Sequence, residues 1–191
     1  MLLASPLKDS AVSLPRRDRL PPIQALLIMG VAGCGKSSVS QTLCRLSGAH
    51  GIEGDAFHPA DNIRKMSAGI PLTDEDRAGW LASLADELRK SLAAGQRPVL
   101  TCSALKHSYR ERLREAVPGL GVVFLELTPE VAARRVADRP GHFMPATLID
   151  SQFAALEPPR DEPLTLVVDA TLPVERIAAT ALAWWHEHDP V

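Results

Sequence analysis

The segment Gly-Val-Ala-Gly-Cys-Gly-Lys-Ser at positions 30–37 constrains the fold of this 191-residue chain more than any other feature. It matches the pattern G-x-x-x-x-G-K-S. An apolar run, residues 25–29, precedes it and is typical of a strand buried on both faces, whereas residues 36 to about 46 favour a helix. In that context the pattern forms a loop that cradles phosphate groups. The sequence therefore predicts an α/β fold with a phosphate-binding loop (P-loop) after its first strand.

Each part of the P-loop has a predicted task in binding ATP and Mg²⁺. Glycine allows backbone angles closed to other residues, so successive amide N–H groups can point at phosphate oxygens, next to the positive end of a helix dipole. Lys36 is expected to reach the β- and γ-phosphates, and the Ser37 hydroxyl to bind Mg²⁺. The predicted nucleotide contacts are Gly30, Val31, Ala32, Gly33, Cys34, Gly35, Lys36, Ser37, Ser38 and, from farther along the chain, Arg135.

Four further apolar segments complete a sheet. Residues 50–55, 98–102, 121–126 and 164–169 are predicted strands that alternate with helical stretches, which is typical of parallel βα units. Between the second and third strands, residues 56 to about 95 form an insertion with a short helix near Ile63 and a longer one over residues 75–92. Thr73 followed by three acidic residues, 74–76, is typical of a helix start; a catalytic role for these acids is the alternative.

Composition and charge exclude several classes of protein. The net charge of −2 supplies no basic field for nucleic acid or an anionic membrane surface, and no apolar run approaches a membrane span. Residues 1–22 are proline-rich and interpreted as a flexible extension, with a nucleic-acid arm or a transit peptide as alternatives, so the folded domain is expected over 23–191.

Cysteine usage favours a reducing cytoplasm. The three cysteines, Cys34, Cys44 and Cys102, are an odd number and widely spaced, which argues against a disulfide framework or a structural zinc site. Cys34 lies inside the P-loop, where the favoured interpretation is a tolerated small residue. The alternative is a thiol whose pKa is lowered by the helix N-terminus.

Acceptor-binding residues are expected where the strands end. Asp55 ends the second predicted strand and is the candidate base for an attacking hydroxyl, with a turn carboxylate or a Mg²⁺ ligand as alternatives. His58 is interpreted equally as a substrate contact or a packing residue. Basic residues at later strand and helix ends suggest a site for an anionic acceptor and a transferring phosphoryl group. They are Arg64, Lys65, Lys106, Arg135 and Arg139, the last two in a predicted lid over about 135–146.

Several short runs beside the P-loop resemble the bacterial gluconokinases. The resemblance extends from about residue 26 to the C-terminus. The runs are GDAFHP at 54–59, NIRKM at 62–66, GIPLTDEDR at 69–77, WL at 80–81, CSALK at 102–106, YR at 109–110 and GHF at 141–143.

This resemblance implies ATP-dependent phosphorylation of D-gluconate to 6-phosphogluconate. It implies a P-loop NTPase fold like that of the nucleoside monophosphate kinases, with a five-stranded parallel sheet flanked by helices, a mobile lid and a homodimer. It also implies that the segment around Arg64 and Lys106 faces the sugar acid and that Arg135 and Arg139 belong to the lid. Arg139 is expected to neutralise the transferring charge, and the predicted substrate contacts are Asp55, His58, Arg64, Lys106 and His142. The alternatives are a small-metabolite kinase of the same fold, acting on shikimate or a nucleotide, and a non-catalytic ATP-dependent switch.

Overall fold

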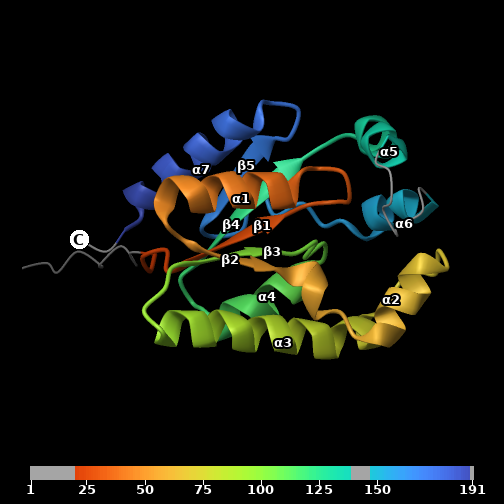
Figure 1. The fold of residues 1–191 in the computed structure, drawn as a ribbon, viewed down its shortest axis with the longest axis horizontal. Helices are drawn as coiled ribbons and strands as arrows, with labels where there is room; N and C mark the ends of the chain where they lie inside the picture. Colours follow the sequence, from red (N-terminus) through yellow and green to blue (C-terminus); the bar gives the residue numbers. More distant parts are fainter. Residues whose placement is uncertain (1–19, 139–146, 190–191) are drawn as a thin grey trace, which may run out of the picture.

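A parallel five-stranded sheet in the order β2-β3-β1-β4-β5 forms the centre of the molecule (Figure 1). The computed structural model describes residues 20–138 and 147–189. Along the chain the elements are β1 (Ala25–Met29), α1 (Lys36–Ser47), β2 (His50–Glu53), a 3₁₀ turn η1 (Gly54–Phe57), α2 (Ala60–Ser67), α3 (Asp74–Ala93), β3 (Pro98–Thr101), α4 (His107–Ala116), β4 (Leu120–Glu126), α5 (Pro129–Ala137), α6 (Thr147–Ala155), β5 (Thr165–Asp169) and α7 (Val174–Glu187).

Alternate residues of β1 divide the core between the two faces of the sheet. Leu26 and Ile28 face a cluster that includes apolar side chains of α1 and α7, whereas Leu27 and Met29 face a second cluster built with α3 and α4. Figure 1 shows these two helix pairs on opposite sides of the sheet. Because β1 pairs with β3 on one side and β4 on the other, it is buried in every direction. The fold predicted from the sequence is confirmed.

The second strand ends two residues earlier than predicted, and Asp55 lies in the turn η1 rather than in the strand. Pairing with β3 stops at Glu53 opposite Thr101. A Cβ atom on Gly54 would lie 2.1 Å from the carbonyl oxygen of Thr101, so this close approach requires glycine. The Trp80 indole N–H donates to the Gly54 carbonyl at 2.8 Å and holds the chain where it leaves the sheet.

The first and last described elements are joined at the edge of the fold where the strands begin. The backbone N–H of Ile23 donates to the carbonyl of His188 at 3.0 Å, and the buried Trp185 indole donates to the carbonyl of Ile23 at 3.0 Å. Of the predicted extension, residues 1–22, only 20–22 belong to the described part. Within the described ranges, no helix is both long and apolar enough to cross a membrane.

Candidate active site

The P-loop connects the carboxyl end of β1 to the start of α1, as the sequence predicts. Gly30, Gly33 and Gly35 all have positive φ angles, of 144°, 80° and 96°. At Gly30 a Cβ atom would lie 2.8 Å from both the Leu125 carbonyl oxygen and the Cys34 sulfur, so only glycine fits there. The result is a turn with a backbone conformation that glycine adopts readily, and turns of this kind can bind phosphate oxygens through their N–H groups.

Two contacts tie the P-loop to its surroundings. The ammonium of Lys36 donates to the carbonyls of Gly30 and Val31, both at 3.1 Å, and so lies across the loop. The Ala32 N–H donates to the side-chain oxygen of Gln152 at 2.7 Å, although 120 residues separate them in sequence. Helix α6 therefore contacts the loop directly. No sequence motif marks Gln152, so sequence reasoning missed it.

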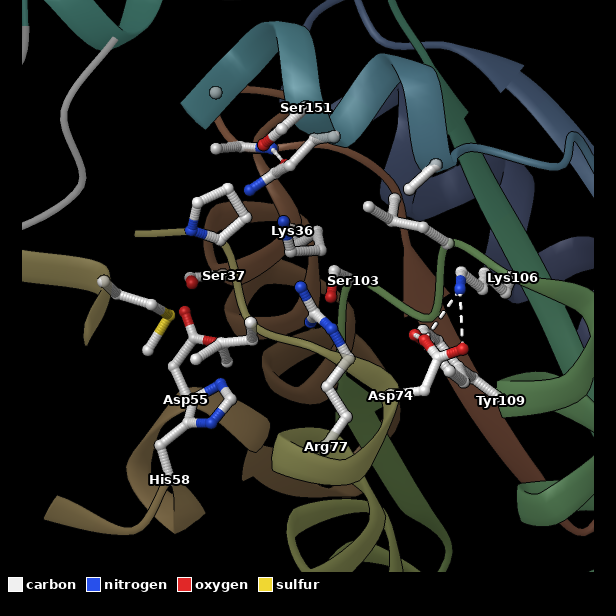
Figure 2. Close-up of a pocket in the computed structure, with 18 of the residues that line it drawn as sticks. Lys36, Ser37, Asp55, His58, Asp74, Arg77, Ser103, Lys106, Tyr109 and Ser151 are labelled. Atoms are coloured by element: carbon white, nitrogen blue, oxygen red, sulfur yellow. Dashed lines mark hydrogen bonds and ion pairs between the residues drawn. The ribbon is translucent and has the colours of Figure 1, made fainter. Parts of the chain in front are cut away.

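A cavity of about 260 Å³ opens beside the P-loop, at the carboxyl ends of β1, β2 and β3 (Figure 2). Its walls come from the P-loop, the turn η1, the start of α3, the segment after β3, and α6. The lining residues are Ala32, Gly33, Gly35, Lys36, Ser37, Ser38, Asp55, His58, Met66, Pro71, Leu72, Asp74, Arg77, Ser103, Leu105, Lys106, Tyr109, Ser151, Gln152 and Ala155. The predicted residues Lys36, Ser37, Asp55, His58 and Lys106 thus lie in one cavity.

One side of this cavity holds Asp55 and His58. In Figure 2 the Asp55 carboxylate points toward the Ser37 hydroxyl at the start of α1. The His58 ring stacks on Trp80 with ring centroids 4.0 Å apart, and burial lowers the pKa of His58 to about 4. A neutral imidazole can donate or accept a hydrogen bond, and a carboxylate can accept one. Both groups can therefore bind a hydroxyl group beside the P-loop.

The opposite side of the cavity is built around Asp74. Its carboxylate accepts hydrogen bonds from the Lys106 ammonium at 2.7 and 2.8 Å and from the Tyr109 hydroxyl. The hydrogen bond from Lys106 is the main reason why the pKa of Asp74 lies below its usual value. The predicted helix cap is confirmed for Thr73 and Asp76, which form a capping box. Asp74 is a first-turn acid of α3, as the favoured interpretation predicts, and it also lines the cavity.

Arg77 is a cavity residue that the sequence analysis missed. Its side chain extends from α3 toward Lys36 and Ser103 in Figure 2, and the guanidinium lies 5.8 Å from the centre of the Tyr109 ring. Within the described part of the chain Arg77 makes no ion pair. An unpaired guanidinium in a polar cavity is suited to bind a carboxylate or a phosphoryl group of a ligand.

Some predicted site residues lie elsewhere. Arg64 is exposed on α2, is paired with Asp61 and does not border the cavity. Lys65 pairs with Asp76 at 2.7 Å. Arg139 and His142 lie outside the described residues, as does most of the predicted lid.

Cys34 is buried, and its burial raises the thiol pKa. Burial of Cys34 agrees with its interpretation as a tolerated small residue, and the raised thiol pKa is opposite to the lowered pKa of the alternative.

A second cavity, of about 280 Å³, lies on the other side of the P-loop. Arg135 borders it and donates to the Gly33 carbonyl at 3.4 Å. Three P-loop residues, Gly33, Gly35 and Ser38, border both cavities. The remaining lining residues are Cys34, Val39, Asp138, Ala170, Leu172, Val174 and Ile177. A ligand with a phosphate chain can therefore extend along the loop from one cavity to the other.

This sheet, its P-loop and the two cavities beside it define a P-loop kinase. A family model described as "AAA domain" matches residues 26–159. A gluconokinase of Gluconobacter oxydans is 50% identical over 137 residues, which are 72% of this chain and 77% of that protein. The chain belongs to the gluconokinase family of P-loop kinases.

Solved structures agree with this assignment. A sugar kinase from Janibacter sp. HTCC2649 superposes with a TM-score of 0.82 at 41% identity, covering 86% of this chain and 95% of that one. A gluconokinase from Sinorhizobium meliloti 1021 superposes with a TM-score of 0.77 at 46% identity, covering 88% and 94%.

Proposed function

We propose that this chain transfers the γ-phosphoryl group of ATP to the terminal hydroxyl of D-gluconate and forms 6-phospho-D-gluconate. The observation that carries the proposal is the P-loop shared by two cavities. One cavity is lined by cations and carboxylates that suit a polyhydroxy acid. The other cavity is bordered by Arg135. The two gluconokinases named above, at 46% and 50% identity, supply the choice of gluconate as acceptor.

Nucleotide binding is assigned to the residues of the P-loop. The glycine-rich turn and the adjoining helix N-terminus suit the phosphates, and the second cavity is proposed to take the nucleoside beside Arg135. Ser37 and Asp55 present a hydroxyl and a carboxylate, which are oxygen ligands of the kind Mg²⁺ prefers. When bound, Mg²⁺ supplies charge neutralisation and a template for the phosphates.

Phosphoryl transfer is assigned to residues of the first cavity. Asp55 is the proposed base and takes the proton of the acceptor hydroxyl. As it does so, the hydroxyl oxygen bonds to the γ-phosphorus, and the bond between the γ-phosphorus and the bridging oxygen of ADP breaks. Lys36 stabilises the charge that shifts toward that oxygen. Lys106 and Arg77 are proposed to bind the acceptor carboxylate, and His58 a hydroxyl.

The other sequence-based assignments remain proposals. Arg139, which lies outside the described residues, is proposed to neutralise the transferring phosphoryl group from a lid over about 135–146, and His142 and Arg64 to join the acceptor. For Arg64 this requires a change from its exposed pairing with Asp61. A homodimer in the cytoplasm is also proposed from the family resemblance, and light scattering after gel filtration tests the dimer.

An acceptor panel tests the proposed function. Purified protein with ATP and Mg²⁺ is offered gluconate, shikimate and nucleoside monophosphates in turn, and ADP release is measured. We expect gluconate to give the highest kcat/KM. Preference for another acceptor would show that this compound, and not gluconate, is the substrate, and the protein would still be a kinase. Nucleotide binding without turnover on any acceptor would instead favour an ATP-dependent switch.

A further inference from the structure

The segment between β3 and α4 forms one wall of the first cavity through a strained turn. Ser103, Leu105 and Lys106 border the cavity, and Ala104 between them has a φ of 42°. This left-handed conformation is unfavourable for a residue with a Cβ atom, so surrounding contacts must hold it. The turn thereby directs Ser103 and Lys106 toward the acceptor side of the cavity (Figure 2).

Arg110 lies directly behind this turn and is fully buried. Its Nη1 donates to the carbonyls of Ala104 at 2.8 Å and Leu105 at 3.0 Å. Its Nη2 donates to the carbonyl of Glu157 at 2.9 Å, and Nε and Nη2 both donate to the Glu162 carboxylate. All three guanidinium nitrogens are thus engaged, and two of these contacts fix the backbone of the strained turn.

The Glu157–Glu162 segment holds the same turn from behind. The N–H of Glu157 donates to the Leu105 carbonyl at 2.9 Å, and the Glu157 carboxylate accepts from the His107 N–H at 2.5 Å. Glu162 also accepts from Arg114 at 2.6 Å. Despite its partial burial, hydrogen bonds from Arg110, His107 and Arg114 lower the pKa of Glu162 to about 2, so this carboxylate stays charged at neutral pH.

A buried ion pair of this kind is a poor source of stability, because desolvation of the charges offsets their attraction. The guanidinium instead fixes the backbone of the turn: it donates to the Ala104 carbonyl and gives the Leu105 carbonyl a second donor beside the Glu157 N–H. Arg110 does not border either cavity. It can therefore affect a ligand only through the residues of the turn.

We propose that Arg110 is a positioning residue for the acceptor, which acts by holding the 103–106 turn so that Ser103 and Lys106 face the substrate. The proposal rests on the proposed function for the identity of that acceptor. The P-loop lies on other elements, and its contacts with Lys36 and Gln152 do not involve the turn. Loss of Arg110 is consequently expected to weaken acceptor binding and to leave nucleotide binding unchanged.

The test compares Arg110→Lys with the control Arg114→Lys. A lysine at 110 keeps the charge, but its single nitrogen cannot bind both carbonyls and also Glu157 and Glu162, as the three guanidinium nitrogens do. Arg114 shares Glu162 yet makes no contact with Ala104 or Leu105, so its replacement disturbs the same carboxylate and leaves the turn held. KM and kcat are measured for gluconate, and calorimetry gives the Kd of a non-hydrolysable ATP analogue with Mg²⁺.

Arg110→Lys is expected to raise the KM for gluconate by about 10- to 100-fold, because small displacements of binding groups have effects of this order. The nucleotide Kd should stay within about 2-fold, and Arg114→Lys should leave both constants near wild type. An unchanged KM with only a lower Tm would overturn the proposal. If Arg110→Lys does not fold, the KM for gluconate is measured for Glu162→Gln, which weakens the carboxylate that holds Arg110. A raised KM is expected, and an unchanged KM would contradict the proposal. If wild type prefers another acceptor, the proposed function fails, and the same comparison is made with that acceptor.

Discussion

The imidazole of His58 lies almost parallel to the indole of Trp80, with ring centroids 4.0 Å apart and the planes inclined by 17°. Trp80 is itself fixed by its hydrogen bond to the Gly54 carbonyl. This stack anchors the turn that carries Asp55 to helix α3, so the proposed base depends on a buried aromatic residue for its position. It also places an ionisable ring where burial opposes a positive charge.

The half-buried imidazole of His58 predicts a loss of stability in mild acid. In the unfolded chain His58 binds a proton near pH 6.5, whereas in the folded protein its pKa is about 4 because of burial. Between these values the unfolded state binds more protons, so the contribution of His58 is complete above pH 6.5 and falls as the pH decreases toward 4. Urea unfolding of wild type and His58→Phe at pH 7.5 and pH 5 measures this. The free energy of unfolding should decrease less in the variant, and equal decreases would contradict the assignment.

Trp80→Phe is expected to destabilise the fold by about 1–3 kcal/mol, because the buried Gly54 carbonyl loses its donor. Thermal and urea unfolding give this difference. Trp184→Phe is the matched control, since Trp184 is only partly buried, and it should cost clearly less. A Trp80→Phe variant as stable as wild type would show that the hydrogen bond does not hold the turn.

Asp55→Asn is expected to lower kcat by about 10²- to 10⁴-fold if Asp55 acts as the base. The amide keeps the size of the side chain but cannot take the proton. Steady-state rates at saturating ATP and gluconate measure the loss. The Mg²⁺ concentration for half-maximal rate is measured in parallel, and a large increase in it with little change of kcat would assign Asp55 to the metal instead.

Lys36→Ala is expected to lower kcat by about 10²- to 10³-fold, in line with the removal of one charge-stabilising donor from an active site. Turnover is followed as ADP release. Lys90→Ala provides the control, because Lys90 is exposed on α3 and pairs only with Glu87. A Lys36→Ala enzyme with a near wild-type rate would contradict the role of the P-loop in phosphoryl transfer.

The parts of the fold that depend on local pattern could be predicted from the sequence. The buried strands are continuous apolar runs, and the strand–loop–helix context of residues 30–37 matches the structure. The end of β2 could not be predicted, because it depends on how closely Gly54 approaches Thr101. No pattern in the local sequence indicates that contact.

The acceptor side of the cavity was predicted less well. Asp74 has a sufficient local explanation as a helix-start residue, which concealed its contacts with Lys106 and Tyr109 across 32 and 35 residues. Arg77 and Gln152 belong to helices whose orientation decides what they face, and no spacing rule gives that orientation. Arg64, by contrast, stands in a family-like run yet is exposed beside Asp61.

The contact of Ile23 with His188 has a practical consequence for engineering. Both ends of the described fold meet where the strands begin (Figure 1). The residues that line the two cavities follow the opposite, carboxyl ends of the strands. A short glycine-rich linker could therefore join residues 23 and 188 and permit circular permutation, with new termini opened in an exposed loop. Attachment to a support at residue 23 or residue 188 would likewise turn both cavities away from it.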